Sequence, residues 1–208
     1  LSLSSYTAQD GTTGTFNDMG FSIGGDFGTI GFAGSESGDA FETDSAVTAD
    51  EGNSIATGTT TALAQLMPGK SANGGSTVSY LSPNISGFQF AVGMSDTAGY
   101  DDGSQAGAQY SMTSGDTTVT IKYAVDNQGK ASSGATEIEA TSAGLVVGYG
   151  DATVTISSNT KSKGSTYDYS SDSIGLSYKV SDALTVAAYT GSTEDSKDSA
   201  HEITDTGL

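Results

Sequence analysis

Apolar residues alternate with small or polar ones through most of this 208-residue chain, and this period of two restricts its fold more than any other feature. In residues 88–94 the even positions are apolar and the odd positions are Gln, Ala and Gly. Similar stretches are residues 118–125, 152–157, 174–180 and 184–188. Because successive side chains of a strand point to opposite faces, we expect about twelve strands, each with one apolar face and one small, polar face.

The connections between these strands fall into a short set and a long set, which alternate. The short connections are rich in Gly, Asn, Asp and Ser, which tolerate the dihedral angles of tight turns. After the first of them, their anchor residues are Asn84, Asp116, Asp151 and Asp182. The long connections are polar and acidic, and we expect them at residues 8–18, 35–74, 96–105, 126–136, 160–170 and 192–199. Each repeat is therefore one hairpin followed by one long loop.

This segregation of loop lengths predicts an all-β fold, a transmembrane antiparallel β-barrel. Outer-membrane barrels have short turns at one end, long loops at the other, and an apolar face that points outward to lipid. A soluble sandwich gives no reason for this segregation, and the Thr, Ser, Gly, Gln and Lys residues of the inward face cannot form a dry core. The aromatic residues suggest two interfacial girdles, with Tyr80, Phe88, Tyr149 and Tyr178 near short turns and Tyr6 and Tyr123 near long loops.

Composition excludes several classes of function. The formal net charge is −18, with seven Lys and no Arg, so the chain has no basic stripe for nucleic acid. The absence of Cys excludes a disulfide scaffold, a zinc–thiolate site and a Cys nucleophile. No run of about 18 apolar residues is present for a membrane helix, but a membrane-spanning strand needs only about 9–11 residues.

Three segments resemble the general porins of Gram-negative bacteria, in an alphaproteobacterial-like form. The sequence GDFGTIGFAG at residues 25–34 looks like the segment that leads into the pore-constricting third loop of these porins. VSYLSP at residues 78–83 and ISGFQFAV at residues 85–92 resemble the two strands that follow that loop. The resemblance implies a 16-stranded outer-membrane homotrimer, surrounded by lipid, through which small hydrophilic solutes and ions diffuse.

The resemblance also implies that residues 35–74 are one long third loop that folds into the barrel, with a short helix at residues 57–65. By strand count, residues 1–208 form a single, incomplete barrel domain that covers roughly the third to the fourteenth of the 16 strands. We therefore expect about four further strands in the full protein, because open edges are prohibitive in lipid. The family's arginine cluster opposite the third loop is not carried over, because this chain has no Arg.

The third loop supplies most of the candidate site residues. Its acidic residues, which we expect at a constriction that attracts cations, are Glu36, Asp39, Glu42, Asp44, Asp50 and Glu51. The channel is therefore predicted to be weakly cation-selective. Residues 39–44 and 50–53 also suggest a divalent cation such as Ca²⁺, but their spacing matches no calcium-loop template, and no cofactor is expected.

Two lysines fall on the inward parity of their strands. Lys122 is in mid-strand, where a lysine that faced lipid would cost roughly 2–4 kcal/mol, so we expect it in the lumen. Lys179 lies close to the turn at Asp182, where its stem can reach water. His201 is the only His, and it lies beside Glu202 without the buried acid that catalysis would need, so we expect no enzyme activity.

One function of another class stays open here, an acidic secreted or cell-surface β-protein of the adhesin or calcium-binding surface-layer type. A calcium-loaded β-roll would need a glycine-rich nonapeptide, and the sequence NGGS at residues 73–76 is not followed by Gly-x-Asp. An adhesin explains neither the segregated turns nor the polar inner face. A requirement for detergent in solution would separate a porin from both.

Overall fold

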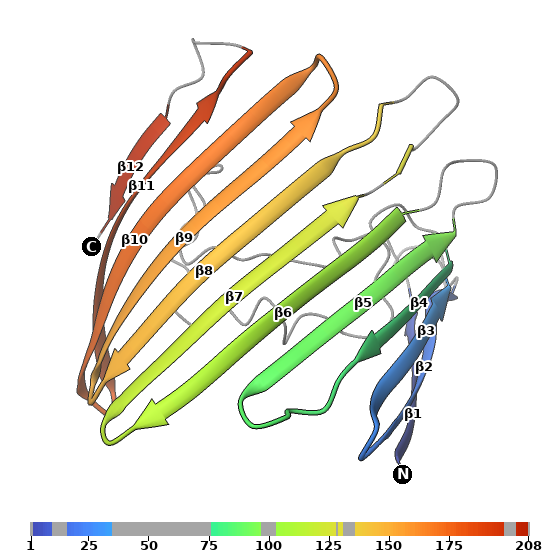
Figure 1. The fold of residues 1–208 in the computed structure, drawn as a ribbon, viewed down its shortest axis with the longest axis horizontal. Coiled ribbons are helices and arrows are strands. Elements are labelled where there is room, and N and C mark those ends of the chain that lie inside the picture. The colour runs from blue at the N-terminus through green and yellow to red at the C-terminus, as the bar shows by residue number, and fades with distance from the viewer. Residues whose placement is uncertain are drawn as a thin grey trace. The chain divides into compact units, whose positions relative to one another are not determined.

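The computed structural model describes residues 2–9, 16–34, 76–96, 103–127, 129–130, 136–197 and 203–207. Within these ranges the chain forms twelve strands, which follow one another through the sheet in chain order (Figure 1). They are β1 (Ser2–Gln9), β2 (Phe16–Gly25), β3 (Gly28–Gly34), β4 (Ser76–Leu81), β5 (Phe88–Asp96), β6 (Gly103–Ser114), β7 (Thr117–Asn127), β8 (Glu139–Tyr149), β9 (Ala152–Lys163), β10 (Tyr167–Ser181), β11 (Leu184–Asp195) and β12 (Ile203–Gly207). The all-β prediction of about twelve strands is confirmed.

The strands belong to two compact units. The first contains β1 to β5, the start of β6 and the end of β7, and the second contains β8 to β12 together with residues 109–124, which are the parts of β6 and β7 on either side of their turn. In the first unit each strand from β1 to β5 pairs antiparallel with the next. In the second unit β8 to β12 pair in the same way. Each unit is therefore a meander of consecutive antiparallel strands held by backbone hydrogen bonds.

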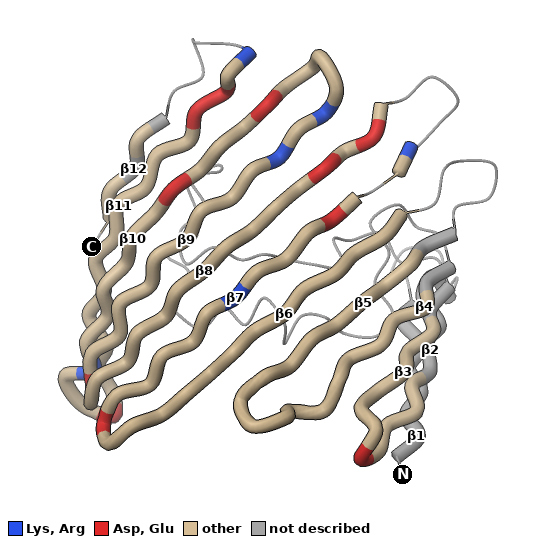
Figure 2. The backbone as a smooth tube through the Cα atoms, viewed as in Figure 1, with Lys and Arg blue, Asp and Glu red and all other residues tan. Residues whose placement is uncertain are grey.

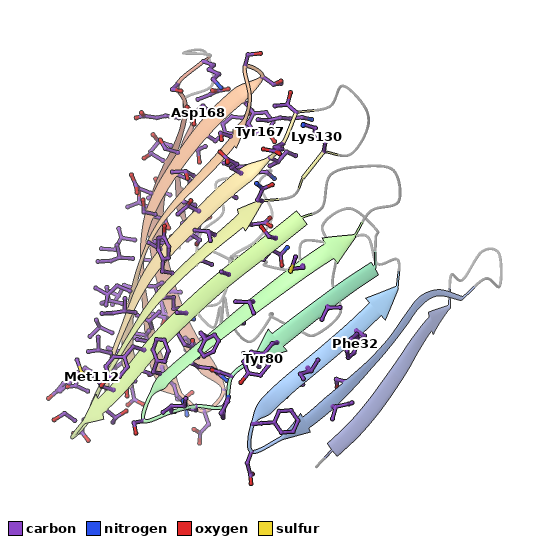
Figure 3. All side chains as sticks on the ribbon, turned by 45° about the vertical axis from the view of Figure 1, so that its right-hand side comes forward. Phe32, Tyr80, Met112, Lys130, Tyr167 and Asp168 are labelled. Atoms are coloured by element: carbon purple, nitrogen blue, oxygen red, sulfur yellow. The ribbon has the colours of Figure 1, made fainter. Side chains whose placement is uncertain are left out.

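Short turns close one end of the strands. Gly115 and Gly150 have φ angles of 58° and 54°, in the left-handed region that glycine adopts without a steric cost. The Asn84 side chain accepts a hydrogen bond from the backbone N of Gly87 at 2.8 Å and shapes the β4–β5 connection. All four predicted anchor residues lie in connections between paired strands. Figure 3 shows Met112 at this end of the second unit.

The predictions of two long connections from the sequence are wrong. Residues 160–170 are not a loop, because β9 continues to Lys163 and β10 begins at Tyr167, its partner in the ladder. Residues 192–199 are not a loop throughout either, since β11 continues to Asp195. The alternation of apolar residues stops before these strands end. Backbone pairing needs no apolar side chains, so the hydrogen-bonded ladder continues past the last alternating residue.

The described residues include no helix that is long and apolar enough to cross a membrane. The predicted third loop, residues 35–74, lies outside the described residues, and with it the short helix expected at residues 57–65.

Candidate functional site

β5 shows how the apolar face of the strands in the first unit is oriented. Phe88, Val92 and Met94 are 42%, 45% and 66% exposed, whereas Ala91, on the opposite face, is only 2% exposed. Phe90 shares the face of Phe88, and their ring centroids are 6.2 Å apart. A soluble core would cover the large apolar side chains first. The apolar side chains of this strand are therefore exposed, as expected for their parity.

The second unit carries a band of half-buried and exposed apolar residues across β8, β9 and β10. Cross-strand partners form three consecutive rows, which are Leu145–Ile156–Ile174, Val147–Val154–Leu176 and Tyr149–Ala152–Tyr178. The tyrosines of the last row are exposed beside the short turns, where the sequence suggested one aromatic girdle. At the other edge, the band ends at the exposed Asp172, which precedes Ile174 by two residues and so lies on the same face.

Small hydroxyl side chains line the opposite face of the same strands. Ser157 and Ser173 are both buried, and their Oγ atoms lie 2.6 Å apart across the β9–β10 ladder. Ser142 Oγ donates a hydrogen bond to Asn159 Oδ1 at 2.5 Å. Side chains this small cannot fill an apolar core, but their hydroxyl and amide groups can hydrogen-bond to water and to hydroxylated solutes.

Lys122 lies on this small-residue face of β7. Its neighbours Ile121 and Tyr123 are exposed on the apolar face, whereas Ala124, on the face of Lys122, is buried. The Cβ of Lys122 lies 3.9 Å from the position that a Cβ would take at Gly144, which is an ordinary van der Waals distance, so the lysine stem lies beside the backbone of β8. Lys122 lies in the middle of β7, which runs from Thr117 to Asn127. Its role in a lumen stays a prediction.

Most other charged residues of the second unit lie toward the strand ends (Figure 2). Lys179 Nζ lies 2.7 Å from Asp182 Oδ1 at the β10–β11 turn, so this lysine is held at the end of its strand, as its position in the sequence indicated. His201 lies outside the described residues. So do the predicted constriction acids, Glu36, Asp39, Glu42, Asp44, Asp50 and Glu51, and the segments considered for Ca²⁺. In the ranges that the structure describes, no group of three or more His, Asp or Glu residues could hold a metal ion.

The hairpin of β9 and β10 carries a group that the sequence interpretation missed, and we call Lys161, Lys163, Tyr167 and Tyr169 the tyrosine–lysine cluster. Lys161 is paired with Tyr169 and Lys163 with Tyr167, so all four project from the face that carries the hydroxyl residues. The two tyrosine rings are stacked, with centroids 4.8 Å apart and an interplanar angle of 24°. In the sequence, the two lysines and the two tyrosines each have an i, i+2 spacing, which could have indicated a shared strand face, but residues 160–170 were expected to form a loop.

The tyrosine–lysine cluster lies beyond the apolar band. Tyr169 precedes Ile174 by five residues, or about 17 Å along an extended strand. Figure 3 shows Tyr167 and Asp168 at this end of the second unit. Partial burial raises the pKa of the Tyr167 phenol above its ordinary value, because desolvation disfavours the charged form.

Two side chains fix the end of this hairpin against β11. The buried Asp195 accepts hydrogen bonds through Oδ1 from the backbone N atoms of Asp168 and Lys197, both at 3.0 Å. The Lys197 ammonium in turn donates to the backbone O atoms of Gly164 and Tyr167. The tip is therefore held by contacts outside its own ladder, which restricts its motion.

Comparison with known proteins agrees with this geometry. A family model described as Gram-negative porin matches residues 3–208. Among solved structures, the chain is similar to a porin refined at 1.8 Å resolution, with a TM-score of 0.50 and 14% identity over 97% of this chain. The chain spans 64% of the length of that porin, and at this identity the likeness shows the fold alone. None of the curated proteins matches the chain at a significant level.

Proposed function

This chain belongs to the Gram-negative porin family, and on that premise we propose that it forms the wall of a water-filled channel for small hydrophilic solutes and ions. Family membership places it in the outer membrane of a Gram-negative bacterium. We propose passive diffusion as the activity, without a cofactor or an enzymatic step, in a trimer of identical subunits. In that trimer, part of the exposed apolar face would contact neighbouring subunits and the rest would contact lipid.

The two faces of the strands are the observation that supports a channel. Leu176 is exposed within a continuous apolar band, while the buried Ser173 and Ser157 hydrogen-bond on the other face. An apolar surface of this extent suits lipid, and a hydrogen-bonding surface suits water in a lumen. The alternative, an acidic secreted or cell-surface β-protein, has no use for an exposed apolar band, and nothing in the structure favours it.

We propose a weak preference for cations. The chain has 25 acidic residues against seven Lys, and six of the acids fall in residues 35–74, where Lys70 is the single basic residue. Fixed negative charge in a narrow passage raises the local concentration of cations. Lys122 opposes this effect on the proposed lumen wall, but one lysine does not balance six carboxylates.

The test is the reversal potential of the protein in planar lipid bilayers under a KCl gradient. We expect stepwise conductance and a reversal potential whose sign indicates a preference for cations. This preference should decline as the Debye length falls from about 10 Å at 0.1 M salt to about 3 Å at 1 M. Changing Glu36, Asp39, Glu42 and Asp44 to their amides should reduce the preference. An absence of conductance steps would contradict the channel, and anion selectivity or unaffected amide variants would contradict the acidic constriction.

Lys122→Gln and Lys179→Gln form a matched pair for the same measurement, because each removes one positive charge. Lys122 lies part-way along its strand, whereas Lys179 is ion-paired at a turn. We therefore expect Lys122→Gln to increase the cation preference and Lys179→Gln to leave it unchanged. Equal effects of the two substitutions would contradict the lumen position of Lys122.

A further inference from the structure

We propose that the tyrosine–lysine cluster binds small aromatic carboxylates. The cluster lies beyond the apolar band, and if the proposed function is right, this position is an entrance of the channel. The binding itself rests on the geometry of the four side chains. A ligand of this class has an anionic group for the ammonium groups and a flat ring for the stacked phenols.

The charge on this face of the hairpin is positive, although the whole chain has a net charge of −18. Lys161 and Lys163 project here and, in the described ranges, neither forms an ion pair. Lys197 brings a third positive charge to the hairpin tip, where its ammonium donates to the carbonyl O atoms of Gly164 and Tyr167, and Asp195, the cross-strand partner of Tyr169, is the acid on the face of the cluster. The other acids of the paired strands, Asp168, Asp172 and Glu194, alternate with the cluster in the ladder and so project from the opposite face.

The aromatic part of the cluster has one side on which a further ring can stack. Tyr167 covers one side of the Tyr169 ring, with 4.8 Å between the ring centroids. The next residue on the other side along the same face is Ser171, whose small hydroxyl accepts a hydrogen bond from Thr193 Oγ1 at 3.1 Å. A ligand ring over Ser171 would extend the stack, and its carboxylate would lie toward Lys161, the cross-strand partner of Tyr169.

The cluster is also held in place before any ligand arrives. Asp195 receives backbone hydrogen bonds from Asp168 and Lys197, and the Lys197 ammonium holds the Tyr167 carbonyl. Binding therefore needs little further ordering of the hairpin, which favours affinity. The two lysines alone would bind any small anion, and the tyrosine stack alone would bind any flat ring. Selectivity for an aromatic carboxylate therefore needs both.

The test compares 4-hydroxybenzoate with its neutral analogue 4-hydroxybenzamide, using the full-length protein in detergent and ligand-detected NMR to measure the Kd. At 0.1 M salt we expect the acid to bind about fivefold more tightly than the amide, because two solvent-exposed charge contacts favour it. In the double variant Lys161→Gln/Lys163→Gln this ratio should fall to near one. The matched control is Lys179→Gln, which should keep the ratio of the unchanged protein.

Tyr169→Leu should weaken the binding of both ligands by about threefold, because it removes the stacking surface and keeps an apolar side chain. Tyr178→Leu, on the exposed apolar face, is the matched control and should change neither Kd. If Tyr169→Leu does not fold, Tyr169→Phe serves instead, since it keeps the ring and should bind both ligands like the unchanged protein.

Equal affinities for the acid and the amide would overturn the role of the lysines. Unchanged binding by Tyr169→Leu, or binding lost in Tyr169→Phe, would overturn the stack. The proposed channel fails separately, by an absence of conductance in bilayers. Conductance without carboxylate binding would overturn only the inference about the tyrosine–lysine cluster.

Discussion

At Gly28, the first residue of β3, there is no room for a Cβ atom. Its φ angle is 102°, and a Cβ there would lie 2.3 Å from the carbonyl O of Leu81 and 3.0 Å from Cδ of Pro83. Close by, the Tyr80 hydroxyl donates a hydrogen bond to the carbonyl O of Phe27 at 2.7 Å. The β2–β3 turn and the start of the β4–β5 connection therefore pack so closely that glycine is needed at this position.

Gly28→Ala should lower the free energy of unfolding by about 2 kcal/mol, because the left-handed backbone and the contact with Leu81 both oppose a Cβ. Gly144→Ala is the matched control, since the nearest atoms to a Cβ there are 3.9 Å away, and its φ angle is not in that region. We expect its effect to stay below about 0.5 kcal/mol. Urea unfolding followed by circular dichroism measures both values, and equal losses would contradict this account.

The two faces of β10 carry different kinds of side chain. Ile174 and Leu176 are exposed on its apolar face, whereas Ser173 and Ser177 project from the other. The register is fixed on both faces, because Ile174 lies opposite Ile156 while Ser173 bonds to its partner Ser157. A slip of one residue would exchange the two faces completely.

Leu176→Lys and Ser177→Lys place the same charge on the two faces of β10. If the exposed face contacts lipid, Leu176→Lys should lower the free energy of unfolding from lipid vesicles by about 2–4 kcal/mol, because the charge enters hydrocarbon. Ser177→Lys should cost less than about 1 kcal/mol, since its ammonium would reach water. Urea titrations in phosphatidylcholine vesicles measure both, and the opposite order would contradict the membrane orientation.

At the scale of the whole molecule, the width of the proposed passage depends on what occupies it. Large barrels of the porin type leave an aqueous lumen, and a segment folded inside reduces its cross-section. The resemblance assigns this role to residues 35–74, and that assignment stays a prediction. Its length alone makes it unusual, because loops of this size in compact proteins commonly have a function.

Deleting residues 44–62 should raise the single-channel conductance, because ions would then cross a wider lumen. A deletion of residues 98–101, from another predicted loop, is the control and should leave the conductance unchanged. Recordings in planar bilayers at 1 M KCl measure the step size with little contribution from surface charge. Unchanged conductance in the 44–62 variant would place the third loop outside the passage.

The sequence by itself determined the strands, their faces and their turns, because these depend on local chemistry. Alternation in residues 88–94 predicts which side chains are exposed, since a strand has a period of two. Anchor residues such as Asp116 and Asp151 mark turns because few residue types tolerate the dihedral angles there. The family resemblance came from local segments as well, and the match over residues 3–208 confirms it.

Only the tertiary structure decided how far the hairpins extend and which distant side chains meet. Residues 160–170 resemble a loop because apolar alternation ends there, while the backbone ladder continues through Lys163 and Tyr167. The stacking of Tyr167 on Tyr169 and the hold of Asp195 on the hairpin tip depend on strand register and on contacts between β10 and β11. Residue spacing along the chain does not determine such contacts, because register is a property of paired strands.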